Sequence, residues 1–203
     1  PDGVMAVVTA DHIIRPVDDF RAALQHGFDL VNTDPTALVT FGVVPTEPNT
    51  GFGYLHRGGR LRPGSRAHQV LEFVEKPSAE VARQYLDSGE YWWNSGMFVW
   101  RAATLLDCLS QLKPQTRHHV DELVADPSRL AEVYPCMEKV SVDIAVMEPA
   151  SHGGCGVHVA AIPLEIQWYD VGSYEALAPH LPSDGMGNNV SGLTVSVDSA
   201  GNL

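Results

Sequence analysis

The sequence has few cysteines and no long hydrophobic run. The three cysteines, Cys108, Cys136 and Cys155, are scattered and form no CxxC pair, so the sequence supports neither a disulfide framework nor a zinc knuckle. No apolar stretch approaches the roughly 18 residues that a membrane span needs. The first residues also lack the basic and small-residue pattern of a secretory leader. We therefore expect a cytoplasmic protein with reduced thiols and no membrane partner.

Basic residues are scarce as well, since 13 Lys and Arg stand against 25 Asp and Glu, giving a formal net charge of −12. This balance argues against nucleic acid as a partner, because phosphate backbones are bound by an excess of Lys and Arg. A small phosphorylated ligand stays compatible with it, because one local cation or a carboxylate-held metal can bind a phosphate. With 203 residues, 44% of them hydrophobic, the chain is long enough for one domain plus an appendage.

Strand-like and helix-like segments alternate along most of the chain. Val-rich or alternating runs predict strands, and apolar residues at helical spacing predict helices. This order predicts an α/β fold with a Rossmann-like, mixed but mostly parallel sheet flanked by helices. The predicted strands are 3–10, 36–45, 69–77, 96–100 and 156–166, with an edge strand near 54, and the predicted helices are 16–32, 79–89, 101–113, 115–126, 128–137, 140–150 and 173–181.

The last residues differ from the rest, because residues 183–203 are rich in Gly, Asn and Ser with short Val-containing pieces. They predict either a linker that ends the chain or the first coil of a left-handed β-helix. We therefore place a boundary near Pro182, with one α/β domain over 1–182.

Two aspartates stand at predicted strand ends. Asp11 follows the first strand in "ADHII", and Asp170 lies between a strand and a helix in "WYDVGSYEAL". Each can be a turn former or a helix cap. Because ligands of open α/β sheets bind beyond the carboxyl ends of strands, the two carboxylates can also meet over one edge and hold Mg²⁺.

A charged pair and a glycine pair form the second group of candidates. Glu75 and Lys76 in "FVEKP" are either a solvated ion pair or a ligand pair, in which Lys76 binds a phosphate and Glu75 accepts from sugar hydroxyls. "TGFGY", which contains Gly53, is either a hairpin turn or a place where the backbone approaches a ligand closely.

The third candidate is Asn94, at the centre of "YWWNSGMFVW". Its amide offers one acceptor and two donors, which match vicinal hydroxyls, and the tryptophans around it offer flat packing surfaces. In contrast, "RHHVDEL" predicts a solvated helix start in preference to a metal cluster, because adjacent helical residues point in different directions.

The motifs "TADHII", "TGFGY", "FVEKP", "YWWNSGMFVW", "SVDIAVMEP" and "WYDVGSYEAL", in this order, resemble those of the mannose-1-phosphate guanylyltransferases. These enzymes are a branch of the sugar-1-phosphate nucleotidyltransferases, which have a GT-A-like nucleotidyltransferase fold. The resemblance covers about residues 4–182.

The resemblance implies that mannose 1-phosphate attacks the α-phosphorus of GTP and gives GDP-mannose and pyrophosphate. The sugar phosphate is its own nucleophile, so catalysis would consist of alignment and charge neutralisation. Asp11 and Asp170 would hold Mg²⁺, Lys76 the sugar phosphate, and Glu75, Asn94 and the backbone at Gly53 the mannose. The aromatic run would wall the pocket and pack behind it, and the tail would suit a homodimer.

The sequence departs from the family at two points. A glycine-rich loop of the type GGxGxRLxPLS, which wraps the nucleotide phosphates, does not occur, so we expect this chain alone to bind GTP poorly. Tyr169 stands where the family has a smaller residue and either crowds Asp170 or faces away. Two other readings stay open: a regulatory or scaffold paralogue that senses sugar nucleotide, and a sister enzyme that uses glucose 1-phosphate.

Overall fold

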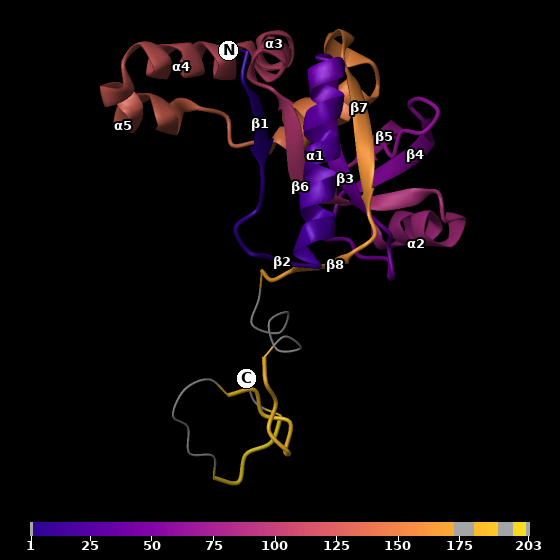
Figure 1. Ribbon diagram of the computed structural model, residues 1–203. Helices are drawn as coiled ribbons and strands as arrows, with labels where there is room; N and C mark the ends of the chain where they lie inside the picture. Colours follow the sequence, from indigo (N-terminus) through magenta and orange to yellow (C-terminus); the bar gives the residue numbers. More distant parts are fainter. Residues whose placement is uncertain (1, 173–180, 191–196, 202–203) are drawn as a thin grey trace.

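A mixed six-stranded sheet with helices on both faces forms the body of the computed structural model (Figure 1), which describes residues 2–172, 181–190 and 197–201. The described strands are β1 (Val4–Val7), β2 (His12–Arg15), β3 (Ala37–Val43), β4 (Tyr54–Arg60), β5 (His68–Val74), β6 (Tyr91–Arg101), β7 (His158–Leu164) and β8 (Gln167–Asp170). The α-helices are α1 (Val17–Thr33), α2 (Ala79–Ser88), α3 (Ala102–Leu112), α4 (Pro114–Ala125), α5 (Leu130–Val133) and α6 (Glu148–Ser151). The 3₁₀ segments are η1 (Pro127–Arg129), η2 (Tyr134–Cys136) and η4 (Gly154–Gly156), and η3 (Asp143–Met147) is a π-helix.

The direction of the strands corrects the prediction of a mostly parallel sheet. The order is β1-β6-β3-β7-β5-β4, and β4 also pairs with β6. Only β3 and β7 pair in parallel among the described strands, whereas the remaining pairs are antiparallel. The α/β fold with a mixed sheet is confirmed. Helices that alternate with strands favour parallel crossovers, but β4 and β5 are antiparallel neighbours and β6 lies between β1 and β3, antiparallel to both.

Local sequence signals account for several helix ends. In α1, Asp18 and Asp19 lie in the first turn, where carboxylates oppose the positive end of the helix dipole. In α2, the side chain of Ser78 accepts from the N–H of Val81, and Gly89 ends the helix with a φ of 67°. Glycine adopts this left-handed conformation without steric cost, so local residues account for both ends of α2.

The strand β6 explains the aromatic decapeptide of the sequence. It is longer than the predicted 96–100, because the whole stretch from Tyr91 to Arg101 is extended. Side chains alternate across a strand, so Trp93 and Val99 pack on the side of α1, whereas Trp92 and Trp100 pack on the opposite side. The tryptophans thus serve both cores of a sheet that is buried on its two faces.

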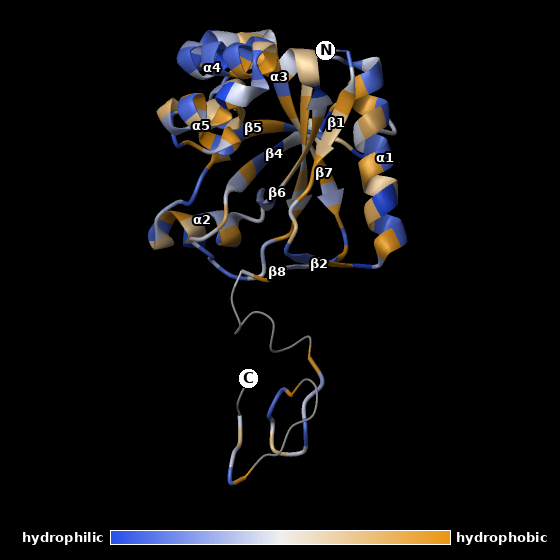
Figure 2. Cartoon of the chain, turned by 90° about the vertical axis from the view of Figure 1, so that its left-hand side faces the viewer, coloured by the Kyte–Doolittle hydropathy of each residue, from blue (hydrophilic) through white to orange (hydrophobic). Residues whose placement is uncertain are grey.

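These two cores hold the body together. One lies between the sheet and α1, which contributes Ala23, Leu30 and Val31. The other lies between the sheet and a group of helices that includes α3, η3 and α6, where Cys108 and Met147 are fully buried. The hydropathy colouring follows this arrangement, since α1 has an apolar side toward the sheet and a polar side outward (Figure 2).

A short ribbon of β2 and β8 closes the lower end of the sheet in Figure 1. It is antiparallel, with His12 opposite Asp170 and Ile14 opposite Trp168. The sequence did not predict either four-residue strand, because neither is long enough for a periodic pattern. The ribbon matters for function because it brings residues 11–12 and 170 together.

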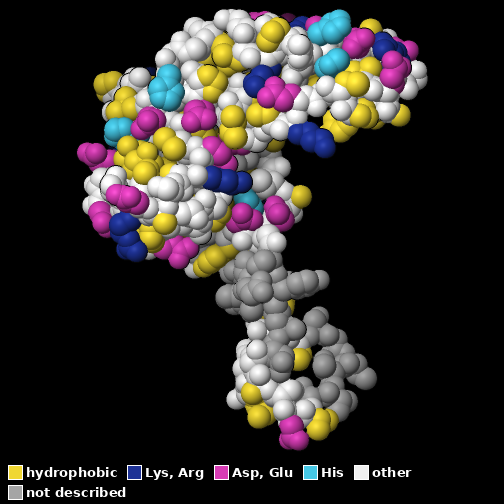
Figure 3. Space-filling model, turned by 180° about the vertical axis from the view of Figure 1, so that it is seen from behind, with side chains coloured by type: hydrophobic (Ala, Val, Ile, Leu, Met, Phe, Trp, Pro, Cys, Tyr) yellow, Lys and Arg dark blue, Asp and Glu magenta, His cyan; other side chains and the backbone are white. Residues whose placement is uncertain are grey.

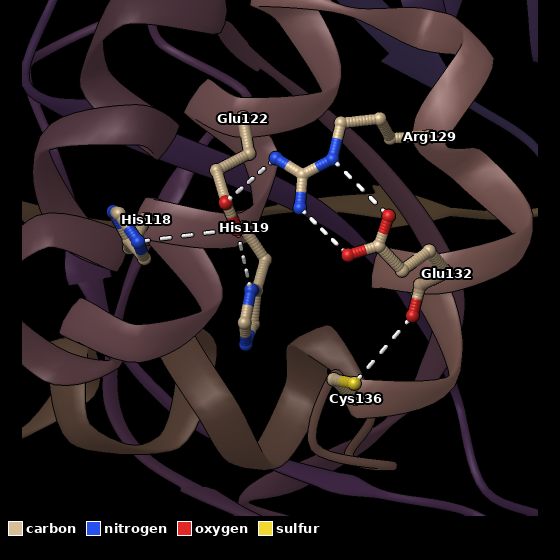
Figure 4. Close-up of polar contacts among 6 residues, drawn as sticks. All are labelled: His118, His119, Glu122, Arg129, Glu132 and Cys136. Atoms are coloured by element: carbon tan, nitrogen blue, oxygen red, sulfur yellow. Dashed lines mark hydrogen bonds and ion pairs between the residues drawn. The ribbon is translucent and has the colours of Figure 1, made fainter.

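The helices α4 and α5 form an arm that extends from the body (Figures 1 and 3). Within it, the Glu122 carboxylate lies 3.1 Å from Nδ1 of His119, 3.9 Å from Nε2 of His118 and 3.0 Å from Arg129, which also pairs with Glu132 (Figure 4). Hydrogen bonds with His119 and Arg129 lower the pKa of Glu122. The "RHHVDEL" stretch is therefore part of an ion-pair network on a helix.

The structure does not test several predictions about the last residues of the chain. The predicted helix 173–181 falls almost wholly outside the described residues, and the boundary near Pro182 and the β-helix stay predictions. Around Asp184, the carboxylate accepts from the N–H groups of Met186 and Asn188 and forms a tight turn. Among the described residues, no helix has the length and apolar character to cross a membrane.

Candidate functional site

The predicted site residues meet in one pocket of about 200 Å³ at the lower end of the sheet. Five of the six predicted residues line it, namely Gly53, Glu75, Lys76, Asn94 and Asp170. They come from the loop before β4, the end of β5, the middle of β6 and the end of β8. The pocket is also lined by Thr9, His12, Gly51, Phe52, Ser95, Gly96, Asp143 and Trp168.

The sixth predicted residue, Asp11, lies beside this pocket. One potential ligand atom each from Asp11, His12 and Asp170 lies within 4.8 Å of the others, and no other such group of three occurs in the described parts of the chain. The ribbon holds the two aspartates together, since the N–H of Val171 donates to the Asp11 carbonyl at 3.2 Å. Two partly exposed carboxylates offer the hard oxygen ligands that Mg²⁺ prefers, so these residues fit a divalent cation.

His12 is the buried member of this group. Its side chain is 6% exposed, and its Nε2 lies 3.9 Å from an oxygen of Asp170. Burial lowers the pKa of His12, although Asp170 and Asp11 oppose that shift. A neutral ring follows from this balance near neutral pH, so the charge at the site comes from the carboxylates.

Glu75 and Lys76 form a pair in which the two charges are unequally exposed. Nζ of Lys76 lies 3.8 Å from Glu75, and the side chains are 64% and 16% exposed respectively. Burial and the nearby Asp143 raise the pKa of Glu75, whereas Lys76 opposes the shift. Lys76 also has a φ of 47°, a strained conformation for a lysine that is most often retained at functional sites. Its ammonium group is accessible to a ligand.

A glycine is needed at position 53 because Glu75 and Asn94 leave no room there for a side chain. A Cβ atom at this position would lie 2.6 Å from Oε2 of Glu75 and 3.4 Å from Cβ of Asn94. The Gly53 carbonyl accepts from the backbone N–H of Asn94 at 2.8 Å. The absence of a side chain at Gly53 thus lets Glu75 reach into the pocket, whereas a close approach of this backbone to a ligand stays a prediction.

Asn94 is held by a buried hydrogen-bond network that the sequence did not reveal. Its Oδ1 accepts from the hydroxyl of Thr40 at 2.8 Å, and its Nδ2 donates to Asp143 at 3.0 Å. Thr40 is fully buried, and its one hydroxyl hydrogen is shared between Asn94 and the Met97 carbonyl, which lies 3.1 Å from the hydroxyl oxygen. Because an amide has two N–H groups, Asn94 keeps one donor for a ligand, fewer than the acceptor and two donors that the sequence suggested.

The aromatic residues at the pocket differ from those predicted. The tryptophans of β6 pack in the cores and do not line the pocket, so only the expected packing behind it is confirmed. Phe52 and Trp168 form the aromatic part of the wall, and Phe52 packs edge-on against Trp168 with ring centres 5.1 Å apart. Tyr169 alternates with its neighbours along β8 and therefore faces away from the side of Trp168 and Asp170.

Sequence signals for the missed residues differ in strength. Asp143 lies inside the quoted motif "SVDIAVMEP", and the π-helix that begins at this residue is a feature frequent at functional sites. His12 and Trp168 each stand two or fewer residues from a predicted metal ligand. Thr40 gives no signal, because a threonine in a buried strand reads as part of the core.

A larger hollow of about 900 Å³ lies between α3 and residues 134–145, near the arm. It is lined mainly by apolar side chains such as Leu105, Leu109, Met137 and Val142. None of the predicted site residues lines it, so the smaller polar pocket is the candidate site.

Comparison with known proteins identifies the class. Residues 1–182 match the family described as nucleotidyl transferase. The chain therefore belongs to the nucleotidyl transferase family.

Particular relatives agree with the resemblance seen in the motifs. The chain is 38% identical over 203 residues to a mannose-1-phosphate guanylyltransferase of Escherichia coli, covering 94% of this chain and 41% of the relative. It is 36% identical over 204 residues to the xanthan biosynthesis protein XanB of Xanthomonas campestris pv. campestris (strain B100), covering 97% and 41%. A crystal structure described as mannose-1-phosphate geranyltransferase from Thermus thermophilus superimposes with a TM-score of 0.75 at 32% identity, covering 91% of this chain and 51% of that one. The chain thus spans about two fifths of the length of these curated relatives.

Proposed function

We propose that the protein carrying this chain transfers a guanylyl group from GTP to mannose 1-phosphate. A phosphate oxygen of the sugar attacks the α-phosphorus of GTP, the bond to the bridging oxygen of the β-phosphate breaks, and GDP-mannose and pyrophosphate leave. The observation that carries this proposal is the convergence of Glu75, Lys76, Asn94 and Asp170 at one pocket, with the Asp11 carboxylate close to that of Asp170. The similarity to mannose-1-phosphate guanylyltransferases supports it.

The sugar phosphate is proposed to bind along the wall formed by residues 75, 76 and 94. Lys76 places an exposed ammonium next to the phosphate, where a point charge binds well. Glu75 accepts hydrogen bonds from two sugar hydroxyls, and the free N–H of Asn94 donates to a sugar oxygen. Gly53 leaves room for Glu75 to do this. These contacts align the nucleophile, which is the main contribution to catalysis in such a reaction.

Asp11 and Asp170 are proposed to hold Mg²⁺. When bound, the ion supplies positive charge that neutralises the phosphates in the transition state. The chain itself contributes the two carboxylates, and the hydrogen bond between Val171 and the Asp11 carbonyl fixes the backbone of both.

The test is product formation by the purified protein with GTP, mannose 1-phosphate and Mg²⁺, with GDP-mannose separated by chromatography and pyrophosphate measured independently. Lys76→Met is expected to lower kcat/KM for mannose 1-phosphate about tenfold to a hundredfold, because a hydrogen bond to a charged group contributes about 1.5–3 kcal/mol. Lys139→Met, which removes an exposed lysine that does not line the pocket, serves as the matched control. A Lys76→Met variant as active as the control would contradict the assignment.

The same assay separates the alternatives. Turnover only with glucose 1-phosphate and another nucleotide would identify a sister enzyme. Binding of GDP-mannose without turnover of any pair would identify a regulatory or scaffold protein. We also propose a homodimer, for which light scattering of the purified protein should give twice the monomer mass.

A further inference from the structure

His12 lies between two groups that give its ring nitrogens different roles. It stands opposite Asp170 in the ribbon of β2 and β8, and its ring packs edge-on against Trp168 with centres 5.1 Å apart. Nδ1 lies 3.1 Å from Nε1 of Trp168, whereas Nε2 lies 3.9 Å from Oδ1 of Asp170. One ring thus connects a core tryptophan to a proposed metal ligand.

The partner of Nδ1 fixes the position of the proton. An indole N–H only donates, so Nδ1 of His12 must accept. A neutral imidazole that accepts at Nδ1 carries its proton on Nε2, on the side of Asp170. Nε2 is then a donor with no lone pair to offer a cation, and Asp170, when ionised, only accepts.

Trp168 is held firmly in this orientation. It is 9% exposed, its cross-strand neighbour is Ile14, and Phe52 packs edge-on against it while also contacting Trp93 at 5.1 Å. The indole N–H is therefore held toward His12 by packing against Phe52 and the core.

We propose that His12 is a positioning residue that directs its Nε2–H at Asp170 and orients this carboxylate, and that Trp168 sets the tautomer of His12. Although His12 lies within 4.8 Å of both carboxylates, it does not ligate the cation. The distance of 3.9 Å is longer than a hydrogen bond, so the proposed contact requires the Asp170 side chain to turn toward Nε2. Outer partners of this kind orient metal-binding side chains. The proposal rests on the proposed function for the role of Asp170.

The direct test is the tautomer of His12, read from long-range ¹H–¹⁵N correlations of histidine rings in the protein at about pH 8, above the ordinary histidine pKa of roughly 6.5. We expect the proton on Nε2. His26 is an internal control with the opposite expectation, because its Nδ1 lies 2.7 Å from the Ala22 carbonyl and must donate. In Trp168→Phe, a population of His12 with the proton on Nδ1 should appear. A proton on Nδ1 in the unmodified protein would overturn the proposal.

A titration with Mg²⁺ alone tests the role toward Asp170. His12→Leu should weaken Mg²⁺ binding about tenfold to a hundredfold, as loss of an outer partner does. His12→Gln, whose amide can supply an N–H near the place of Nε2, should recover much of the loss. If both variants bind Mg²⁺ as tightly as the unmodified protein, or if Mg²⁺ removes the proton from Nε2, the positioning role is wrong.

The role of His12 and the proposed metal site are refuted by different results. Normal Mg²⁺ binding that depends on Asp170, combined with the wrong tautomer of His12, would overturn this inference alone. If Asp170→Asn binds Mg²⁺ as tightly as the unmodified protein does, the proposed metal site is wrong, and the role of His12 is wrong with it.

Discussion

The buried hydroxyl of Thr40 offers a sharp test of how the pocket is held. Its single hydrogen is shared between Oδ1 of Asn94, 2.8 Å away, and the Met97 carbonyl, 3.1 Å away. Thr40→Val keeps the shape of the side chain but removes the donor, and Asn94, which is 7% exposed, loses the partner of its acceptor. Since the site is within the sheet, water has little access to replace the hydroxyl.

The expected cost follows from the groups left without partners. A buried acceptor that loses its donor costs about 1–3 kcal/mol. For a chain of this size, each kcal/mol lowers Tm by about 2–4 °C. The KM for mannose 1-phosphate should also rise, because the Asn94 amide is free to turn, whereas kcat should change less, because the groups proposed to act at the phosphates are not touched.

The assay is a double-mutant cycle of Thr40→Val with Asn94→Ala, measured by urea unfolding. Residues in direct contact typically show a coupling of about 0.5–3 kcal/mol. Thr46→Val, at an exposed position, is the matched control and should change stability by less than about 0.5 kcal/mol. Additive effects of the two substitutions, together with an unchanged KM in Thr40→Val, would refute the network.

Three further predictions concern other parts of the structure. Gly53→Ala should raise KM for the sugar phosphate about tenfold or more, because its Cβ displaces the Glu75 carboxylate and a charged hydrogen bond is worth about 1.5–3 kcal/mol; Gly59→Ala, which meets no neighbour, is the control, and equal effects would contradict the reasoning. Burial raises the pKa of Glu75 in the folded protein above its ordinary value of 4.5, so the folded protein loses stability as pH rises through this raised pKa. Glu75→Gln should therefore have a higher Tm than the unmodified protein at neutral pH and no advantage at pH values below 4.5. A Tm difference between the two proteins that does not change with pH would contradict this. Burial and a neighbouring thiol raise the pKa of Cys108 to about 12, so mass spectrometry should find the exposed Cys136 alkylated first in the native protein, and equal rates would refute the burial of Cys108.

Much of the candidate site could be predicted from the sequence, but the directions of the strands could not. Glu75, Lys76 and Asn94 could be named because charged and amide groups at strand ends or within apolar runs are conspicuous. The direction of β6 could not be predicted, since a strand buried on both faces has the same composition in parallel and antiparallel sheets. That direction decides toward which end of the sheet the Asn94 part of β6 lies, so the pocket could not be located without the fold.

The meeting of Asp11 and Asp170 was predicted for a partly wrong reason. We expected two strands of one parallel sheet to end at a common edge. In the structure, a separate antiparallel ribbon of four-residue strands brings them together. Such short strands show no hydrophobic periodicity in the sequence. The proposed roles of His12 and Trp168 therefore could not be predicted, because they depend on contacts across these strands.

The proposal that Asp11 and Asp170 hold a divalent cation is tested most directly by locating such a cation on the protein. Mn²⁺ added in place of Mg²⁺ broadens the NMR signals of nearby amides, and the broadening falls steeply with the distance between the amide and the ion. We expect broadening first at residues 11–12 and 170–171, with weaker effects at residues 75–76, and loss of this pattern in Asp170→Asn. Broadening centred on the Glu122 network of the arm, or spread evenly over the acidic surface, would contradict it.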